Sequence, residues 1–231
     1  SQTLRLNPLE TGKLVGMEIY PRALRIVREN LGKKDAPPPV RGEIDNFSDK
    51  SRSRLRFVAG NTCVDLVSQF CLTYHHQTPD GRTVKRHLNA FLTWLRKNYP
   101  GIHYLWILEF QTRRIPHFHV YLSLPHTTTG LHKALAKAWH RIAEPDSPEH
   151  LRFHLHPRNF TAWDMTSPGY LTKYLEKQNQ KLVPEGFTGC GRFWGHSRNL
   201  VAVPEITTLE EVKALDWFDQ STGEYQDAER Y

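Results

Sequence analysis

The chain has 231 residues, with 31 basic and 24 acidic side chains, a net charge of +7 and an isoelectric point near 9.4. This size suits a domain that buries its own core, and the charge makes a polyanion the first partner to consider. The longest apolar runs are far shorter than the roughly 20 residues of a membrane helix, so no membrane partner is expected. The 3 cysteines form no Cys-x-x-Cys pair, which argues against a disulfide framework and indicates a reducing compartment.

The charge is unevenly distributed along the chain. Residues 205–231 hold 2 basic and 8 acidic side chains, whereas the rest of the chain holds 29 and 16. Residues 1–60 are polar and end in the basic stretch Ser51–Arg56, so they are predicted to be a basic N-terminal extension with one helix over Pro21–Asn30. Residues 61–204 are predicted to form the functional domain, followed by an acidic C-terminal tail.

Strand and helix periodicities alternate within residues 61–204. This order predicts an α+β fold, in which a central antiparallel β-sheet is flanked by helices. Two of the strands are joined by a short basic turn, Thr112–Pro116, and are expected to form a hairpin. The predicted strands are Val67–Tyr74, Ile102–Gln111, His117–Leu124, Leu151–His156 and Leu200–Val203, and the predicted helices are Val84–Asn98, Leu131–Ile142 and Pro168–Gln180.

The histidines of the second hairpin strand indicate a metal site. Side chains alternate along a strand, so His117 and His119 share one face while Phe118 points into the core. Two imidazoles placed in this way can share a metal ion. Glu109 on the partner strand joins them if the turn has an odd number of residues, and the expected turn places it opposite His119. Glu109, His117 and His119 are therefore the predicted metal ligands.

A second histidine pair has the same spacing. His154 and His156 are followed by proline rather than by an apolar strand, and no hairpin partner supplies an acid. For a single histidine on a strand, the usual alternative is a partly buried ring held by a hydrogen bond. We therefore rank this pair well below His117 and His119.

Paired tyrosines mark the last predicted helix. Tyr170 and Tyr174 are four residues apart and share a helix face, and Lys173 and Lys177 form a row beside them. A phenol becomes a useful nucleophile when its negative charge is stabilised, which lysines and a divalent ion can do. Taken alone, the segment also suits an ordinary amphipathic helix whose tyrosines cap the core. Together with a metal site, it indicates transesterification of a phosphodiester.

These motifs resemble those of a known family. His117-Phe-His119 resembles the histidine motif of the HUH endonucleases, and Glu109–His119 resembles its form in rolling-circle replication initiators. Tyr170–Lys177 is similar to the tyrosine motif of the two-tyrosine branch. Phe70–Tyr74 lies where the family has its first strand motif, and Gly191–Gly195 resembles a segment that follows the tyrosines. Histidines that precede the tyrosines, without a cysteine-rich zinc segment, favour an initiator over a relaxase or a transposase.

The resemblance implies an RRM-like HUH endonuclease domain and a nickase mechanism. Mg²⁺ or Mn²⁺ would polarise the scissile phosphate of a single-stranded origin hairpin, and a tyrosine would attack it to leave a 5′-phosphotyrosine. Tyr170 and Tyr174 would be the nucleophiles, with Lys173 and Lys177 stabilising charge. A host helicase and polymerase would be partners in the cytoplasm of a bacterial or phage-infected cell. The predicted DNA-binding residues are Arg113, Arg114, Arg192 and Trp194.

Other functions fit part of the pattern. An antiparallel sheet with basic and aromatic residues also suits a non-catalytic module that binds single-stranded nucleic acid. A zinc hydrolase could use the two histidines and Glu109 alone. An HUH transposase would share the histidine and tyrosine motifs. The conjunction of metal ligands and paired tyrosines favours the replication initiator.

Overall fold

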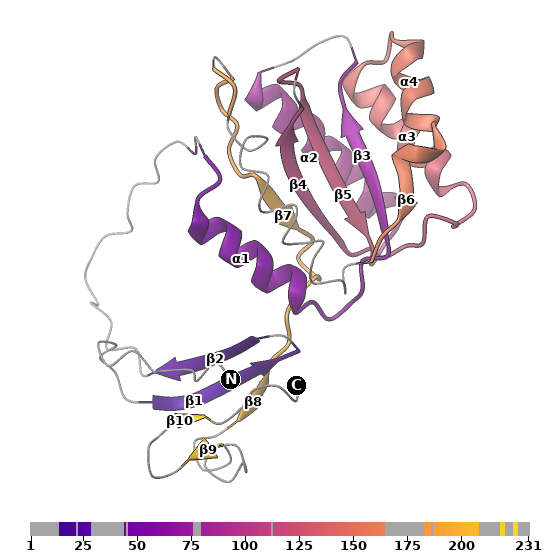
Figure 1. Cartoon of the computed structure of the whole chain (residues 1–231). Helices are drawn as coiled ribbons and strands as arrows, with labels where there is room; N and C mark the ends of the chain where they lie inside the picture. Colours follow the sequence, from indigo (N-terminus) through magenta and orange to yellow (C-terminus); the bar gives the residue numbers. More distant parts are fainter. Residues whose placement is uncertain are drawn as a thin grey trace. The chain divides into compact units, whose positions relative to one another are not determined.

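The computed structural model describes residues 14–21, 23–28, 44, 46–75, 80–111, 113–164, 183–185, 187–207, 218–219 and 224–225. The chain divides into two compact units. One consists of residues 1–40 and 202–231, and the other of residues 41–201. Both are drawn in Figure 1, and each is described by itself. Within the described ranges, no helix combines the length and the apolar character needed to cross a membrane.

The smaller unit contains a three-stranded sheet in the order β2-β1-β8. β1 (Leu14–Tyr20) pairs antiparallel with β2 (Ala23–Arg28) and, on its other side, with β8 (Glu205–Thr207). The helix predicted over Pro21–Asn30 is therefore wrong. Isoleucine and valine favour a strand there, and the hairpin partner in β1 supplies the backbone hydrogen bonds. A short two-stranded ladder joins β9 (Phe218–Asp219) and β10 (Glu224–Tyr225).

The larger unit contains a five-stranded sheet in the order β6-β3-β5-β4-β7. Every neighbouring pair is antiparallel, and helices flank the sheet, so the predicted α+β fold is confirmed. The expected hairpin is the pair β4 and β5. The strands are β3 (Ser68–Thr73), β4 (Tyr104–Phe110), β5 (Pro116–Leu122), β6 (Phe160–Ala162) and β7 (Trp194–His196). The helices are α1 (Asp49–Gly60), α2 (Gly81–Asn98), α3 (Leu131–Ala143), α4 (Pro148–Leu155) and the 3-10 turn η1 (Pro157–Asn159).

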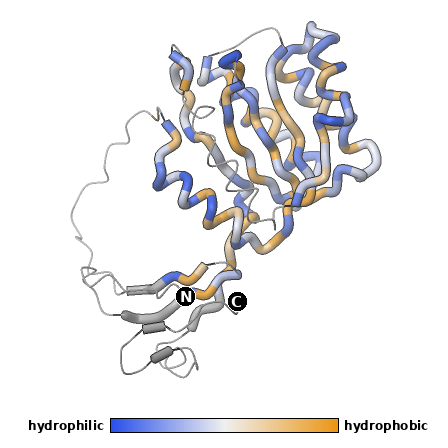
Figure 2. The backbone as a smooth tube through the Cα atoms, viewed as in Figure 1, coloured by the Kyte–Doolittle hydropathy of each residue, from blue (hydrophilic) through white to orange (hydrophobic). Residues whose placement is uncertain are grey.

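One face of this sheet packs on α2 and α3. Phe70 of β3 stacks on Phe91 of α2 with ring centroids 6.5 Å apart, and Phe91 meets Trp139 of α3 edge to face at 5.9 Å. Phe118, Val120 and Leu122 of β5 are fully buried in the same core. Hydrophobic residues accordingly follow the central strands in Figure 2. Because strand side chains alternate, the odd-numbered residues of β5 face the other way.

Two segments differ from their predicted structure. Leu151–His156, expected to be a strand, lies almost wholly in α4, because Pro148 occupies the first turn and the Ser147 hydroxyl accepts a hydrogen bond from the His150 amide. The basic stretch Ser51–Arg56, expected to be a linker, lies within α1, which Ser48 caps. The strand predicted over Leu200–Val203 is not formed, and β7 lies earlier in the chain. The helix predicted over Pro168–Gln180 lies outside the described residues.

Candidate metal centre

The two histidines of β5 lie side by side on the sheet face away from α2 and α3. His117 and His119 pair with Thr73 and Cys71 of β3, so all of these residues lie on the same face. The two imidazole centroids are 4.6 Å apart. His119 is 8% exposed, and His117 is half-buried. The shared face expected from strand alternation is present.

Glu109 of β4 lies on the same face but in a register other than the expected one. It pairs with His117 rather than with His119, because β4 ends at Phe110 and β5 begins at Pro116. The intervening turn has an odd number of residues, as the prediction required, but it begins one residue earlier than expected and ends one residue earlier. Those shifts move the pairing by two positions, which preserves the face and changes the opposing residue.

The Glu109 carboxylate nevertheless contacts His119. Its Oε2 lies 3.2 Å from Nε2 of the ring, and the side chain is only 4% exposed as a residue. This is a diagonal contact across the β4–β5 ladder. It leaves Nδ1, on the opposite edge of the ring, directed toward β3.

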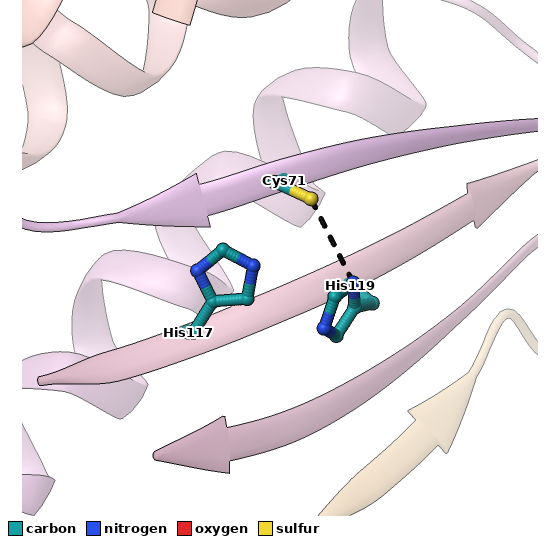
Figure 3. Close-up of side chains that lie close together, drawn as sticks. All are labelled: Cys71, His117 and His119. Carbon is teal, nitrogen blue, oxygen red and sulfur yellow. Dashed lines mark hydrogen bonds between the residues drawn. The ribbon is translucent and has the colours of Figure 1, made fainter. Parts of the chain in front are cut away.

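A cysteine that the sequence reasoning missed completes the cluster. Cys71 lies opposite His119 on β3, and its Sγ is 3.7 Å from Nδ1 of that ring (Figure 3). One ligand atom each from Cys71, His117 and His119 lies within 4.8 Å of the other two. Within the described ranges, this is the one group of three or more such residues able to hold a metal ion. Cys71 belongs to the strand motif Phe70–Tyr74, and a known β3–β5 register would have placed it beside the histidines.

The protonation of the cluster is strongly coupled. Burial would raise the pKa of the Cys71 thiol, but hydrogen bonds from His117 and His119 outweigh it and lower that pKa to about 5. Burial would likewise lower the pKa of His119, but Cys71 and Glu109 raise it to about 9. Near neutral pH the metal-free site therefore favours a thiolate beside an imidazolium. A thiolate is the form of cysteine that binds metals.

Two glutamine amides border the cluster. Nε2 of Gln69 lies 2.8 Å from Nδ1 of His119 and 3.4 Å from Sγ of Cys71. Nε2 of Gln111 lies 3.1 Å from Nδ1 of His117. Because Gln111 engages Nδ1, the Nε2 atom of His117 is the nitrogen left for an ion. Each histidine thus has one ring nitrogen held by a neighbour, as in many protein metal sites.

The residues predicted to bind DNA occupy two places in the larger unit. Arg113 and Arg114 are exposed in the β4–β5 turn, and Arg114 has a left-handed backbone with φ of 62°. Arg192 is also exposed, and its carbonyl oxygen accepts a hydrogen bond from the Lys85 ammonium. Trp194 of β7 is half-buried, and its indole N–H donates to Ser51 Oγ of α1 at 3.0 Å.

The proposed nucleophiles belong to another part of the chain. Tyr170, Lys173, Tyr174 and Lys177 lie outside the described residues. Their assignment therefore remains a prediction from the sequence.

The competing histidine pair has a structural role. His154 is fully buried in α4, where its Nδ1 lies 2.8 Å from the His150 carbonyl oxygen and its Nε2 accepts from the Thr73 amide at 3.3 Å. This neutral ring links α4 to the end of β3. His156 is exposed and caps η1, its Nδ1 accepting from the Arg158 amide. The low rank of this pair as metal ligands agrees with these separate roles.

The fold and the cluster together define an α+β protein with a candidate metal centre on one face of an antiparallel sheet. Residues 67–179 match a family model described as Replication-associated protein ORF2. This segment, which carries the whole cluster, belongs to that family, and the predicted kinship with rolling-circle replication initiators is confirmed at that level. Neither a curated protein nor a solved structure matches the chain.

Proposed function

We propose that this protein initiates rolling-circle replication by nicking and rejoining single-stranded origin DNA. The observation that supports this most directly is the His117–His119 pair, with Cys71 and Glu109 beside it, inside the segment that matches a replication-associated family. Such a site can bind a divalent ion at the surface of a sheet, which is what metal-assisted phosphodiester chemistry requires. The two-tyrosine type remains part of the proposal.

The reaction would be a transesterification. The hydroxyl oxygen of Tyr170 or Tyr174 attacks the scissile phosphorus and loses its proton, while the bond from phosphorus to O3′ breaks and O3′ takes up a proton. The products are a 5′-phosphotyrosine and a free 3′-hydroxyl that can prime synthesis. Lys173 and Lys177 would stabilise the phenolate and the phosphate charge. Attack by the 3′-hydroxyl on the phosphotyrosine reverses the step without ATP.

A divalent ion would supply charge stabilisation on the scissile phosphate. The phosphate oxygens of the substrate suit Mg²⁺ or Mn²⁺, the ions expected from the sequence. The residues around the site have their own tasks. Gln111 and Glu109 orient His117 and His119, and the buried position of His119 limits its access to water.

Basic residues of the larger unit would hold the DNA strand. Arg113 and Arg114 are exposed at the end of the hairpin that carries the histidines, and Arg192 is exposed elsewhere in the same unit. Guanidinium groups bind backbone phosphates without regard to sequence. Trp194 would offer part of its ring for base stacking, since its indole N–H is already engaged by Ser51. A host helicase and polymerase would extend the nick in the cytoplasm of a bacterial or phage-infected cell.

A covalent adduct tests this function. The protein is incubated with Mn²⁺ and a pool of single-stranded DNA hairpins labelled at the 3′ end, since the strand 3′ to the nick stays on the tyrosine. A denaturing gel should show a labelled protein band. The band should be lost in the Tyr170→Phe, Tyr174→Phe double variant and kept in Tyr99→Phe, whose ring packs on Trp94.

Other outcomes separate the alternatives. An adduct that persists in the double variant would show that the nucleophile is another residue. DNA binding without cleavage would favour a non-catalytic binding module. Cleavage without an adduct would favour a metal-dependent hydrolase that uses the histidine site alone.

A further inference from the structure

We infer that the Cys71 thiolate is a direct metal ligand with His117 and His119, and that the centre selects thiophilic divalent ions of the zinc class over Mg²⁺. The inference deepens the proposed function and rests on it for the role of the ion. The ligand assignment itself rests on the arrangement of side chains on the sheet. It replaces Glu109, the third ligand expected from the sequence, by a residue on the other neighbouring strand.

The distances favour a nitrogen and sulfur donor set. In a tetrahedral zinc site with ordinary bond lengths, ligand atoms lie roughly 3.3–3.6 Å apart. The Cys71 Sγ to His119 Nδ1 distance of 3.7 Å is close to that value. All three candidate ligand atoms lie within 4.8 Å of one another, so small side-chain rotations would bring them around one ion. These residues lie on adjacent strands in fixed register, which holds the ligand set in place.

Glu109 is placed to orient a ligand rather than to be one. Its carboxylate contacts Nε2 of His119, whereas Cys71 and Gln69 lie at Nδ1 on the other edge of the same ring. An imidazole that binds a metal through one nitrogen commonly donates its other N–H to a carboxylate. Glu109 can accept that hydrogen bond while Nδ1 binds the ion. The Gln111 amide at Nδ1 of His117 plays the corresponding part for the second histidine.

The donor chemistry then sets the choice of metal. Thiolate and imidazole ligands favour Zn²⁺, Co²⁺ and Cd²⁺, whereas Mg²⁺ prefers oxygen ligands and retains its water. A site of two imidazoles and one thiolate also leaves a fourth position open for a phosphate oxygen. The protein would thus combine a thiophilic ion with an oxygen ligand from the substrate.

Spectroscopic titration without DNA tests the inference. Adding Cd²⁺ or Co²⁺ to the full-length protein should produce the thiolate-to-metal charge-transfer absorption at one equivalent. Cys71→Ser should abolish that absorption. Cys63→Ser, at an exposed thiol, and Cys190→Ser, at a buried thiol, should retain it. About a hundredfold excess of Mg²⁺ should leave the absorption unchanged, because Mg²⁺ competes poorly for sulfur.

Several results would overturn the inference. These are the absence of the charge-transfer band in the folded wild-type protein, its persistence in Cys71→Ser, or its removal by Mg²⁺. Cys71→Asp provides a second variant, in which the oxygen ligand should shift the preference toward Mn²⁺ and Mg²⁺. Because these measurements need neither DNA nor a tyrosine, they stand apart from the adduct assay. Failure of the adduct assay with a normal thiolate band would contradict only the nicking function.

Discussion

Oε2 of Glu109 lies 3.2 Å from Nε2 of His119, although the strand register pairs Glu109 with His117. The carboxylate thus reaches diagonally across two strands to the histidine that also faces Cys71. This contact fixes the ring orientation and directs Nδ1 toward the thiol, 3.7 Å away. A carboxylate predicted to bind the metal is therefore better placed to orient a metal-binding ring.

Replacing Glu109 by glutamine tests that role. Glu109→Gln keeps a hydrogen-bond acceptor at Nε2 but removes the charge, so we expect affinity for Cd²⁺ or Zn²⁺ to fall by about 10- to 100-fold. The thiolate charge-transfer band should keep its position and intensity at saturation. Asp146→Asn, at an exposed loop position, is the control. Loss of the band in Glu109→Gln at saturating metal would contradict a purely orienting role.

The sequence could predict the histidine face but not the whole cluster. Alternation along β5 needs only local information, so the shared face of His117 and His119 followed from their spacing alone. The position of Glu109 depended on the turn boundaries, and a small error there moved the register by two residues. Cys71 lies on a strand distant in sequence, and the β3–β5 register depends on packing of the core face.

Long-range pairing also explains the error near the N-terminus. The segment Ala23–Arg28 lies within a predicted helix, but β1 provides a strand partner for it, and β8 from the far end of the chain lies on the other side of β1. Strand formation depends more on such partners than on intrinsic preference. The error at α4 differs in kind. Ser147 and Pro148 are local start signals for a helix, and they are present in the sequence.

The edge strand β7 should be sensitive to added volume at Gly195. Gly195 pairs with Trp106, and a Cβ at this position would lie 2.9 Å from indole atoms. Gly195→Ala should therefore lower the free energy of unfolding by about 1–3 kcal/mol, measured by urea denaturation. The exposed neighbour His196→Ala is the control. In a Trp106→Leu background the cost should shrink, and an equal cost in both backgrounds would exclude a clash with the indole.

The buried His154 should make stability depend on pH. Burial, together with the nearby His150, lowers the pKa of His154 to about 3, whereas an unfolded histidine has a pKa of about 6.5. Between these values the unfolded chain binds the additional proton, so this contribution to stability is complete above pH ~6.5 and is lost as the pH falls toward 3. The slope from one such group reaches about 1.4 kcal/mol per pH unit.

Denaturation across this pH range tests the contribution of His154. His154→Gln can still accept from Thr73 and donate to the His150 carbonyl oxygen, but it cannot take up a proton. We expect the decline in the free energy of unfolding below pH ~6.5 to become shallower in this variant. His126→Gln, at an exposed histidine, should retain the wild-type slope. Identical slopes in all three proteins would show that His154 is not the group responsible.

The hairpin arginines should contribute to DNA affinity through charge alone. Arg114 has φ of 62°, so glycine suits its backbone, whereas Arg113 can be replaced by alanine. The Arg113→Ala, Arg114→Gly variant should bind single-stranded DNA more weakly and show a smaller salt dependence. Because this variant neutralises two fewer phosphates, the slope of log K against log salt should decrease in magnitude by about 1.4. Lys137→Ala, Arg141→Ala, which removes two exposed charges from α3, is the matched control. Fluorescence anisotropy at several salt concentrations measures both quantities, and an unchanged slope in the hairpin variant would place these arginines outside the DNA interface.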